Sequence, residues 1–217
     1  QFLYFIGVRM KRPPLLVFAQ LYDVMVTYHP RYPTRVIQRP GLPGLLKKMS
    51  ELDDAGLTRT ILTSSLLESL GRNAFDSVSK LHTLQIDPAS DFSQNSARAR
   101  VLFEVEDAAA AAEVSTRSIR AVVFNTEVRA PMWHFDSQVG VTRFAPAFTR
   151  EERQERRAKG IRPEDDATME NMAEVIEALA KTDMPVGEAL PMIPQVRVKQ
   201  MPDVGSCVLL VNDRIPR

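Results

Sequence analysis

The chain of 217 residues contains a single cysteine, Cys207, so no disulfide bond can form within it. It also lacks a run of about 18 apolar residues, the minimum for a transmembrane helix. These two absences exclude a disulfide-stabilised scaffold and predict a protein without a membrane span. Cys207 lies in the apolar segment 204–211, which predicts a buried strand and an inert thiol rather than a reactive one.

The residue patterns of common catalytic sites are absent as well. The histidines His29, His82 and His134 stand at metal-ligand spacing neither from one another nor from the cysteine. The nine glycines are scattered, so no glycine-rich phosphate loop is present, and no serine stands in a Gly-x-Ser-x-Gly elbow. Distant residues can still assemble a catalytic triad. The pattern nevertheless favours a binding protein over an enzyme, and we expect neither a cofactor nor a metal ion.

Charge of one sign is concentrated at the N-terminus, although the net charge of the whole chain is only +1. Residues 1–39 hold six basic residues and one acidic residue, whereas residues 40–139 and 140–217 are both slightly acidic. A basic arm on a nearly neutral body favours contact with a polyanion, and a solvated tail is the competing interpretation. The first residue, Gln1, fits either a chain whose targeting peptide was removed or a truncated chain.

The first 56 residues predict an arm, a strand and a helix. Pro13 and Pro14 interrupt regular structure, so we expect residues 1–20 to form an extended basic arm. Residues 21–27 alternate in the way of a strand. Residues 44–56 place Leu45, Leu46, Met49 and Leu52 at helical spacing, and Gly56 stands where a helix C-cap is expected.

The next segments complete a β-α-β-β-α-β order over residues 21–130. Residues 57–79 predict a long strand that bends at Gly71, and residues 81–97 predict an inserted loop. A strand over 98–106, an alanine-rich helix over 107–115 and a strand over 119–128 follow. This order predicts an α+β, ferredoxin-like fold with a four-stranded antiparallel sheet and two helices on one face.

Residues 131–217 are predicted to form a C-terminal extension. Thr149 and Glu152 form a capping box that predicts a charged helix over 150–159. A second helix carries an apolar stripe, which either belongs to the chain's own core or docks on another subunit. Four prolines between 185 and 202 predict an extended path after it. The residues of this stripe, and of the sheet edge at 59–70, are the candidate partner-binding set: Leu62, Leu66, Leu70, Met169, Met172, Ile176 and Leu179.

Nucleic-acid contacts are predicted from basic residues in the arm and near the second and third strands. Lysine and arginine side chains gain affinity for phosphates by releasing counterions, and exposed aromatic rings can stack on RNA bases. Tyr28 and Tyr32 are the candidate stacking rings. The candidate RNA-binding set is Arg9, Lys11, Arg12, Arg31, Arg35, Arg72, Lys80, Arg98 and Arg100.

Three segments together resemble the S-six family of small-subunit ribosomal proteins, in the bacterial-type form. Residues 21–30 resemble the family's first strand and the turn after it, and residues 67–80 resemble its stretch around a Gly-Arg pair, here Gly71 and Arg72. Residues 101–106 and 118–123 resemble the family's strand, helix and Val-Ile-Arg before the last strand. Asn73 stands where a second basic residue is usual in the family. The resemblance covers about half of the chain.

The resemblance implies a structural constituent of the small ribosomal subunit that binds its rRNA and a ribosomal protein of the S-eighteen family. The extensions and the low net charge suit a mitochondrial form, placed in the matrix, whose extensions contact other mitoribosomal proteins. An accessory subunit of another mitochondrial assembly, such as a respiratory or ATP synthase complex, is the alternative. An enzyme on a ferredoxin-like fold is a third possibility.

Overall fold

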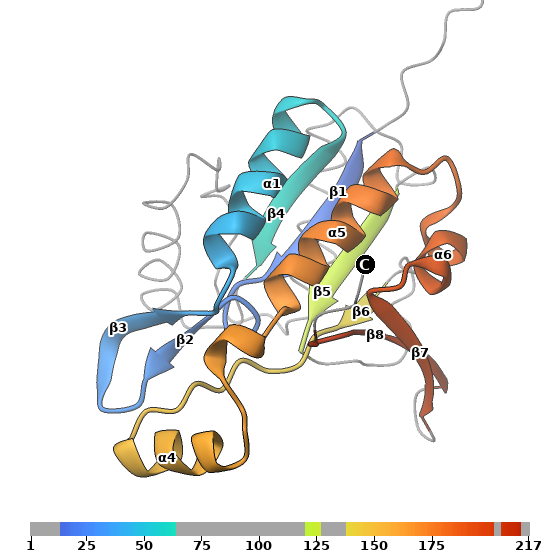
Figure 1. Ribbon diagram of the computed structural model, residues 1–217. Helices are drawn as coiled ribbons and strands as arrows, with labels where there is room; N and C mark the ends of the chain where they lie inside the picture. Colours follow the sequence, from blue (N-terminus) through green and yellow to red (C-terminus); the bar gives the residue numbers. More distant parts are fainter. Residues whose placement is uncertain (1–13, 64–119, 127–137, 202–204, 214–217) are drawn as a thin grey trace, which may run out of the picture.

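The computed structural model of the chain describes residues 14–63, 120–126, 138–201 and 205–213 (Figure 1). Its centre is a six-stranded sheet in the order β4-β1-β5-β6-β8-β7. Neighbouring strands run parallel from β4 to β8, and only the edge strand β7 is antiparallel. The strands are β1 (Leu15–Gln20), β4 (Thr58–Thr63), β5 (Ala121–Asn125), β6 (Gln138–Gly140), β7 (Val196–Met201) and β8 (Gly205–Leu210).

Two long helices cover one face of this sheet. Helix α1 (Leu42–Asp54) lies over β4 and β1, and α5 (Thr168–Lys181) lies over β1 and β5 (Figure 1). A separate hairpin of β2 (Val26–His29) and β3 (Tyr32–Gln38) projects from one end of the sheet, beside helix α4 (Arg150–Ala158). Shorter helical turns are η2 (Pro163–Asp165), α6 (Val186–Ala189) and η3 (Leu190–Met192). The fold is therefore α/β.

The predicted ferredoxin-like, four-stranded antiparallel sheet is wrong. Residues 15–20, which were expected in an extended arm, form the interior strand β1 between β4 and β5, and five of the six are buried. A continuous apolar run of this kind is typical of a parallel strand that is covered on both faces. The strands β6, β7 and β8, from the expected C-terminal extension, belong to the same sheet as β1.

The segment that was expected to form the first strand is mainly a tight turn. The carbonyl oxygen of Leu21 accepts hydrogen bonds from the backbone N–H groups of Met25 and Val26, and the N–H of Asp23 donates to Val26. Asp23 has a φ of 65°, in the left-handed region that few residues other than glycine adopt. The alternating pattern of 21–27 therefore arises from a buried turn that connects β1 to the hairpin.

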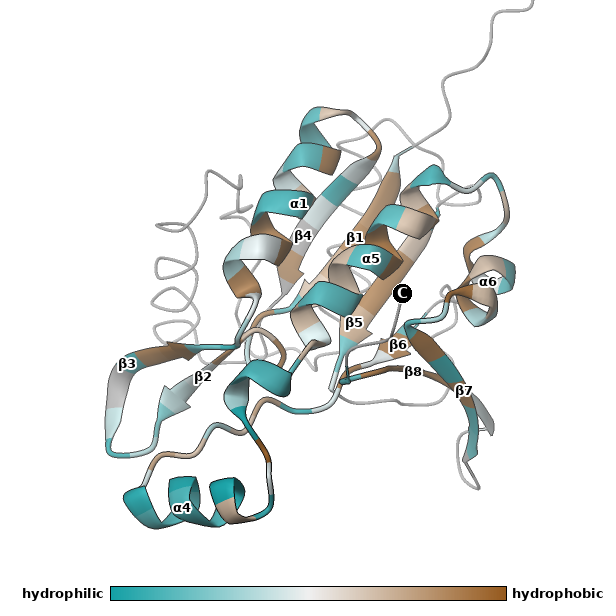
Figure 2. Ribbon diagram, in the orientation of Figure 1, coloured by the Kyte–Doolittle hydropathy of each residue, from teal (hydrophilic) through white to brown (hydrophobic). Residues whose placement is uncertain are grey.

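The core fills the space between the sheet and the two long helices. The two helices and β1 contribute many of its side chains, among them Leu15, Val17, Leu42, Leu45, Leu46, Met49, Met169, Met172, Ile176 and Leu179. Each is at most 1% exposed. A fully buried side chain of this size stabilises a fold by about 1.5–3 kcal/mol. Figure 2 shows the strands β1 and β5 as hydrophobic and helix α4 as almost entirely hydrophilic.

Gly41 permits the close packing of the two helices. It caps the start of α1 with a φ of 79°, and a Cβ atom at this position would lie 3.2 Å from the Cβ of Met169 on α5. A larger residue would therefore combine backbone strain with a clash.

The predicted helix over 44–56 and the charged helix over 150–159 are confirmed as α1 and α4. The strand around Cys207 is confirmed as β8, which buries Cys207 and Leu210 but leaves Gly205 and Ser206 exposed. The extended path expected after residue 185 is partly wrong, since α6 and η3 precede β7. Of the long strand expected over 57–79, the structure describes residues 57–63, which contain β4, and the rest lies outside the described residues. The strand over 98–106, the helix over 107–115 and the loop over 81–97 lie outside the described residues. Among the described helices, none is long and apolar enough to cross a membrane.

Candidate nucleic-acid interface

The carboxyl ends of the parallel strands are the usual ligand site of an open α/β sheet. Here this edge carries neutral amides that bind one another. The Oε1 atom of Gln20, at the end of β1, accepts hydrogen bonds from the N–H and the hydroxyl of Thr126, at 3.1 and 3.4 Å. Gln138 Nε2 donates to Asn125 Oδ1 at 2.8 Å. These side chains join the strand ends to each other.

The amides described at this edge do not themselves supply acid–base chemistry. An uncharged amide neither accepts nor releases a proton near neutral pH, and general acid–base catalysis needs a group that does both. Asp23 lies close by in the chain, but its carboxylate is paired with Arg143. Within the described ranges, no group of three or more His, Cys, Asp or Glu side chains could hold a metal ion.

The other polar region is an arm at the same end of the molecule. It consists of the β2–β3 hairpin, residues 26–38, and the α4 segment, residues 144–162, and we call it the hairpin–α4 arm. The rings of His29 on the hairpin and Phe148 before α4 meet edge to face, with centroids 5.3 Å apart. The two parts of the arm therefore contact each other, as Figure 1 also shows.

Helix α4 forms without burying any side chain. Its start is held by a capping box, in which Glu152 N donates to Thr149 Oγ1 at 3.1 Å and Glu152 Oε2 accepts from Thr149 N at 3.1 Å. The same oxygen accepts from Phe148 N at 2.7 Å. These two backbone hydrogen bonds lower the pKa of the Glu152 carboxyl. Farther along, Arg156 donates to the carbonyl oxygen of Ala145, which ties the helix to the segment before it.

Two ion pairs fix the arm to the sheet, and we call them the arginine clasp: Arg39–Asp166 and Arg143–Asp23. The Arg39 side chain is 3% exposed, and its Nε donates to Asp166 Oδ2 at 2.8 Å. Its Nη1 atom donates to two carbonyl oxygens, those of Thr142 at 2.7 Å and of Val24 at 3.2 Å. One guanidinium therefore joins the base of the hairpin, the segment before α4 and the segment after it.

Aromatic packing and the second ion pair complete the clasp. The Arg39 guanidinium lies 5.6 Å from the ring centre of Phe144, whose N–H donates to the carbonyl oxygen of Asp23 at 2.6 Å. Arg143 pairs with the buried carboxylate of Asp23. Because both ends of the α4 segment are held, the arm is built to keep one orientation relative to the sheet.

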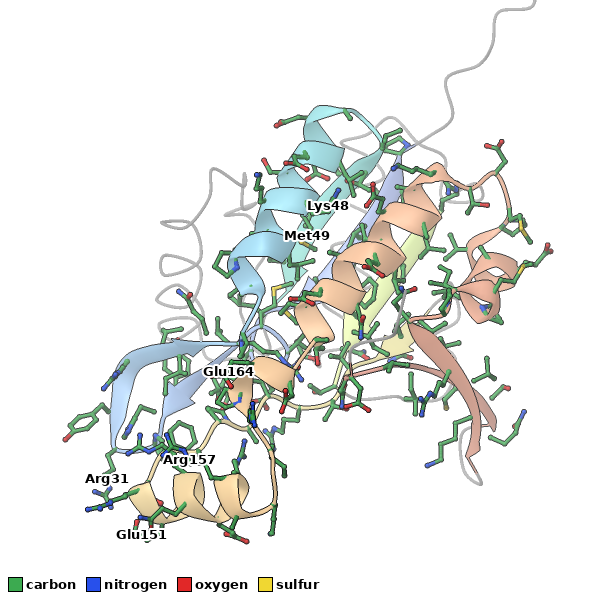
Figure 3. All side chains as sticks on the ribbon, viewed as in Figure 1. Arg31, Lys48, Met49, Glu151, Arg157 and Glu164 are labelled. Atoms are coloured by element: carbon green, nitrogen blue, oxygen red, sulfur yellow. The ribbon has the colours of Figure 1, made fainter. Side chains whose placement is uncertain are left out.

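The arm carries a cluster of exposed arginines. Arg150, Arg153 and Arg157 stand three and four positions apart on α4, so they share one side of the helix. Figure 3 shows Arg157 on the side of α4 toward the hairpin, Glu151 on the opposite side, and Arg31 at the hairpin tip. None of the cluster forms an ion pair with a carboxylate in the described part of the chain. Its members are Arg31, Arg35, Arg150, Arg153, Arg157 and Arg162.

The same arm carries an exposed aromatic ring, on the hairpin next to Arg31. Tyr32 is 59% exposed, the second largest value among the exposed hydrophobic side chains. It is paired with His29 across the hairpin, and the two ring centres are 5.0 Å apart. Tyr28, the other candidate stacking ring, is half-buried and packs against the core.

Of the predicted RNA-binding residues, the structure brings Arg31 and Arg35 together on the arm. The remaining members of that set lie outside the described residues: Arg9, Lys11, Arg12, Arg72, Lys80, Arg98 and Arg100. Four arginines of the arm, at positions 150, 153, 157 and 162, were missed. The sequence predicted only a charged helix over 150–159, and the available signal was the spacing of Arg150, Arg153 and Arg157 on one side of it.

The predicted partner-binding residues belong to the chain's own core wherever they are described. Met169, Met172, Ile176 and Leu179 are each 0% exposed, and Leu62 is 6% exposed. The stripe therefore belongs to the chain's own core. Its side chains pack between α5, α1 and the sheet and are not available to another subunit. Leu66 and Leu70 lie outside the described residues.

Comparison with known proteins gives no further guide to this site. No protein-family model matches the chain, and no curated protein matches it.

Proposed function

We propose that this chain is a non-enzymatic, RNA-binding structural subunit of a ribonucleoprotein. The observation that supports the proposal is the hairpin–α4 arm, which carries six exposed arginines and an exposed tyrosine. Arginine contacts to phosphates supply sequence-independent affinity for nucleic acid, and aromatic rings add contacts with unpaired bases. The arginine clasp holds the arm in place before binding, which lowers the entropy lost when a complex forms.

A role other than catalysis is supported by the amide-lined edge. Catalytic groups of an open α/β sheet stand at the carboxyl ends of its strands, where this chain has Gln20, Asn125 and Thr126. The Gln20 amide is engaged by Thr126 and by the carbonyl oxygen of Tyr22, so it holds the strand ends together. Gln20, Asn125 and Thr126 thus have a structural role that needs no substrate.

The assembly that we propose to test first is the small mitochondrial ribosomal subunit. This choice rests on the resemblance of residues 21–30, 67–80 and 101–123 to the ribosomal S-six family, and not on the fold, since the fold that the family implies is not the observed one. RNA binding by the arm does not depend on that resemblance. The two parts of the proposal can therefore fail separately.

A fluorescence-anisotropy titration with a labelled RNA that has no secondary structure tests the RNA-binding part. The variant Arg153→Glu/Arg157→Glu reverses two charges on exposed positions of α4. We expect its dissociation constant to rise at least about tenfold at about 0.1 M salt, because two phosphate contacts become repulsions.

The matched control is Lys47→Glu/Lys199→Glu, which changes the net charge equally but on exposed positions of α1 and β7, away from the arm. We expect a much smaller loss of affinity from the control. Equal losses would show a nonspecific charge effect and would remove the arm as the RNA site. Sedimentation of the tagged chain in a gradient of mitochondrial ribosomes then tests the assembly, and its absence from the small-subunit fractions would reject the ribosomal assignment.

An accessory subunit of another mitochondrial complex is the second candidate. The observation that favours it is the mixed charge of α4, where Glu151, Glu152 and Glu155 alternate with the arginines. A surface of both signs suits a protein partner better than a phosphate backbone, which repels carboxylates. Comigration with a respiratory or ATP synthase complex after detergent extraction, together with no measurable affinity for RNA, would favour this candidate.

A further inference from the structure

The tip of the hairpin presents one side chain whose exposure has no structural explanation. Tyr32 begins β3 directly after the turn at Pro30 and Arg31, and its ring is 59% exposed. The residues on both sides of the turn are a register pair, His29 and Tyr32. An aromatic ring that packed only for stability would bury more of its surface, because burial is the source of that stability.

The ring is nevertheless supported from one side. The imidazole of His29 lies with its centre 5.0 Å from the Tyr32 ring, at an interplanar angle of 43°. The Nδ1 atom of His29 accepts a hydrogen bond from the backbone N–H of Arg31 at 3.2 Å, which restrains the imidazole. Phe148 meets the same imidazole edge to face at 5.3 Å. Tyr32 is therefore an exposed ring on an aromatic base that both halves of the arm build.

We infer that Tyr32 is a stacking platform for an unpaired RNA base, and that the hairpin–α4 arm consequently prefers single-stranded RNA to duplex RNA. This inference rests on the proposed function and specifies the kind of RNA that the arm recognises. The faces of unpaired bases are open to an aromatic ring, whereas the bases of a duplex are already stacked on one another. Arg31, next to the platform, is placed to contact the adjoining phosphate.

Base stacking and arginine–phosphate contacts contribute differently to the binding of single-stranded and duplex RNA. Stacking of one base on an aromatic side chain contributes about 1–3 kcal/mol by alanine substitution. Arginine contacts with phosphates contribute to single-stranded and duplex RNA alike. Loss of the ring should thus weaken only single-stranded binding, whereas loss of arginines should weaken both.

The experiment measures the affinity of the full chain for a labelled oligouridylate and for an RNA duplex of equal length, in one buffer. We expect the wild-type chain to bind the oligouridylate more tightly than the duplex. For Tyr32→Ala we expect a dissociation constant about tenfold higher for the oligouridylate, and a change of less than about twofold for the duplex. Tyr32→Phe keeps the ring and should retain wild-type affinity for both RNAs.

The possible results distinguish this inference from the proposed function. If neither RNA binds the wild-type chain, both the proposed function and the stacking platform are rejected. If RNA binds and Tyr32→Ala changes both affinities equally or changes neither, the platform is rejected while RNA binding stands. Circular dichroism of each variant checks that it is folded. A loss of oligouridylate affinity in a folded Tyr32→Phe variant, which keeps the ring, would also reject the platform, whether or not the alanine variant folds.

Discussion

Helices α4 and α5 follow one another in the chain and differ in almost everything that holds a helix in place. In α5, eight residues are buried, and its apolar side packs against α1 and the sheet. In α4, none is buried, and its position depends on a capping box, a hydrogen bond from Arg156 and the arginine clasp. The comparison shows that α5 is held by the core, whereas α4 is held by polar contacts, so the charged side chains of α4 remain exposed.

The largest expected loss of stability comes from breaking the arginine clasp, which joins the arm to the sheet. Replacing Arg39 by methionine removes the cation that pairs with the partly buried Asp166 carboxylate, and it removes a donor from two carbonyl oxygens. Removing one partner of a buried ion pair costs about 3–5 kcal/mol, so the free energy of unfolding should fall by about that amount in urea titrations.

The matched control for the clasp is Lys48→Met, which removes the more exposed pairs of Lys48 with Glu51 and Glu177. Exposed pairs contribute at most about 1 kcal/mol, so we expect little change from this variant. A clasp variant no less stable than the Lys48 variant would show that the arm is held by something else.

The second prediction compares the two helices directly. Met172 on α5 is fully buried, and Gln154 on α4 is exposed. Met172→Ala removes core contacts and should lower the free energy of unfolding by about 2–5 kcal/mol. Gln154→Ala should change it by less than about 0.5 kcal/mol. Similar losses in the two variants would contradict the contrast between the helices.

The third prediction concerns the capping box of α4. Thr149→Ala removes the hydroxyl that accepts from the backbone N–H of Glu152, at a cost of about 1 kcal/mol. Since α4 has no buried side, we expect the loss to be local. Amide hydrogen exchange should become faster in α4 and stay unchanged in α5. Faster exchange in both helices would mean that α4 unfolds together with the core.

The smallest expected effect is the response of α4 to acid. Backbone hydrogen bonds from Thr149 and Phe148 lower the pKa of Glu152 in the folded chain. A lowered pKa means that the contribution of this carboxylate is present above its ordinary pKa and is lost as the pH falls through the folded value. The protection of the first-turn amides of α4 against hydrogen exchange, measured relative to their intrinsic exchange rate at each pH, should therefore fall on acidification, and Glu152→Gln should abolish that dependence. An unchanged dependence in the variant would exclude Glu152 as its source.

Local patterns predicted the elements whose determinants are near in sequence. The apolar spacing of Leu45, Leu46 and Met49 predicted α1, and Thr149 with Glu152 predicted α4 and its capping box. The strand β1 was missed because Pro13 and Pro14 suggested an arm. Its parallel partners, β4 and β5, are remote in the chain, and no local pattern specifies such pairing. The predicted fold class was therefore wrong, because β1 was absent from the list of segments and its pairing is non-local.

The residues of the candidate site also divide into those that local patterns predicted and those whose position depends on contacts between remote segments. Arg31, Arg35 and Tyr32 were predicted because charge and aromatic residues stand together in the sequence. The arginines of α4 were missed because their place beside the hairpin depends on the Arg39–Asp166 pair, whose partners are 127 positions apart. A contact over that distance cannot be inferred from periodicity.

The salt dependence of RNA binding tests the central claim most directly. If the six arginines of the arm contact phosphates of single-stranded RNA, the logarithm of the association constant should fall with the logarithm of salt concentration at a slope of about −4. In Arg153→Glu/Arg157→Glu the slope should become shallower by at least about 1.4, because two contacts are lost. A wild-type slope near zero, or an identical slope in the variant, would contradict the account.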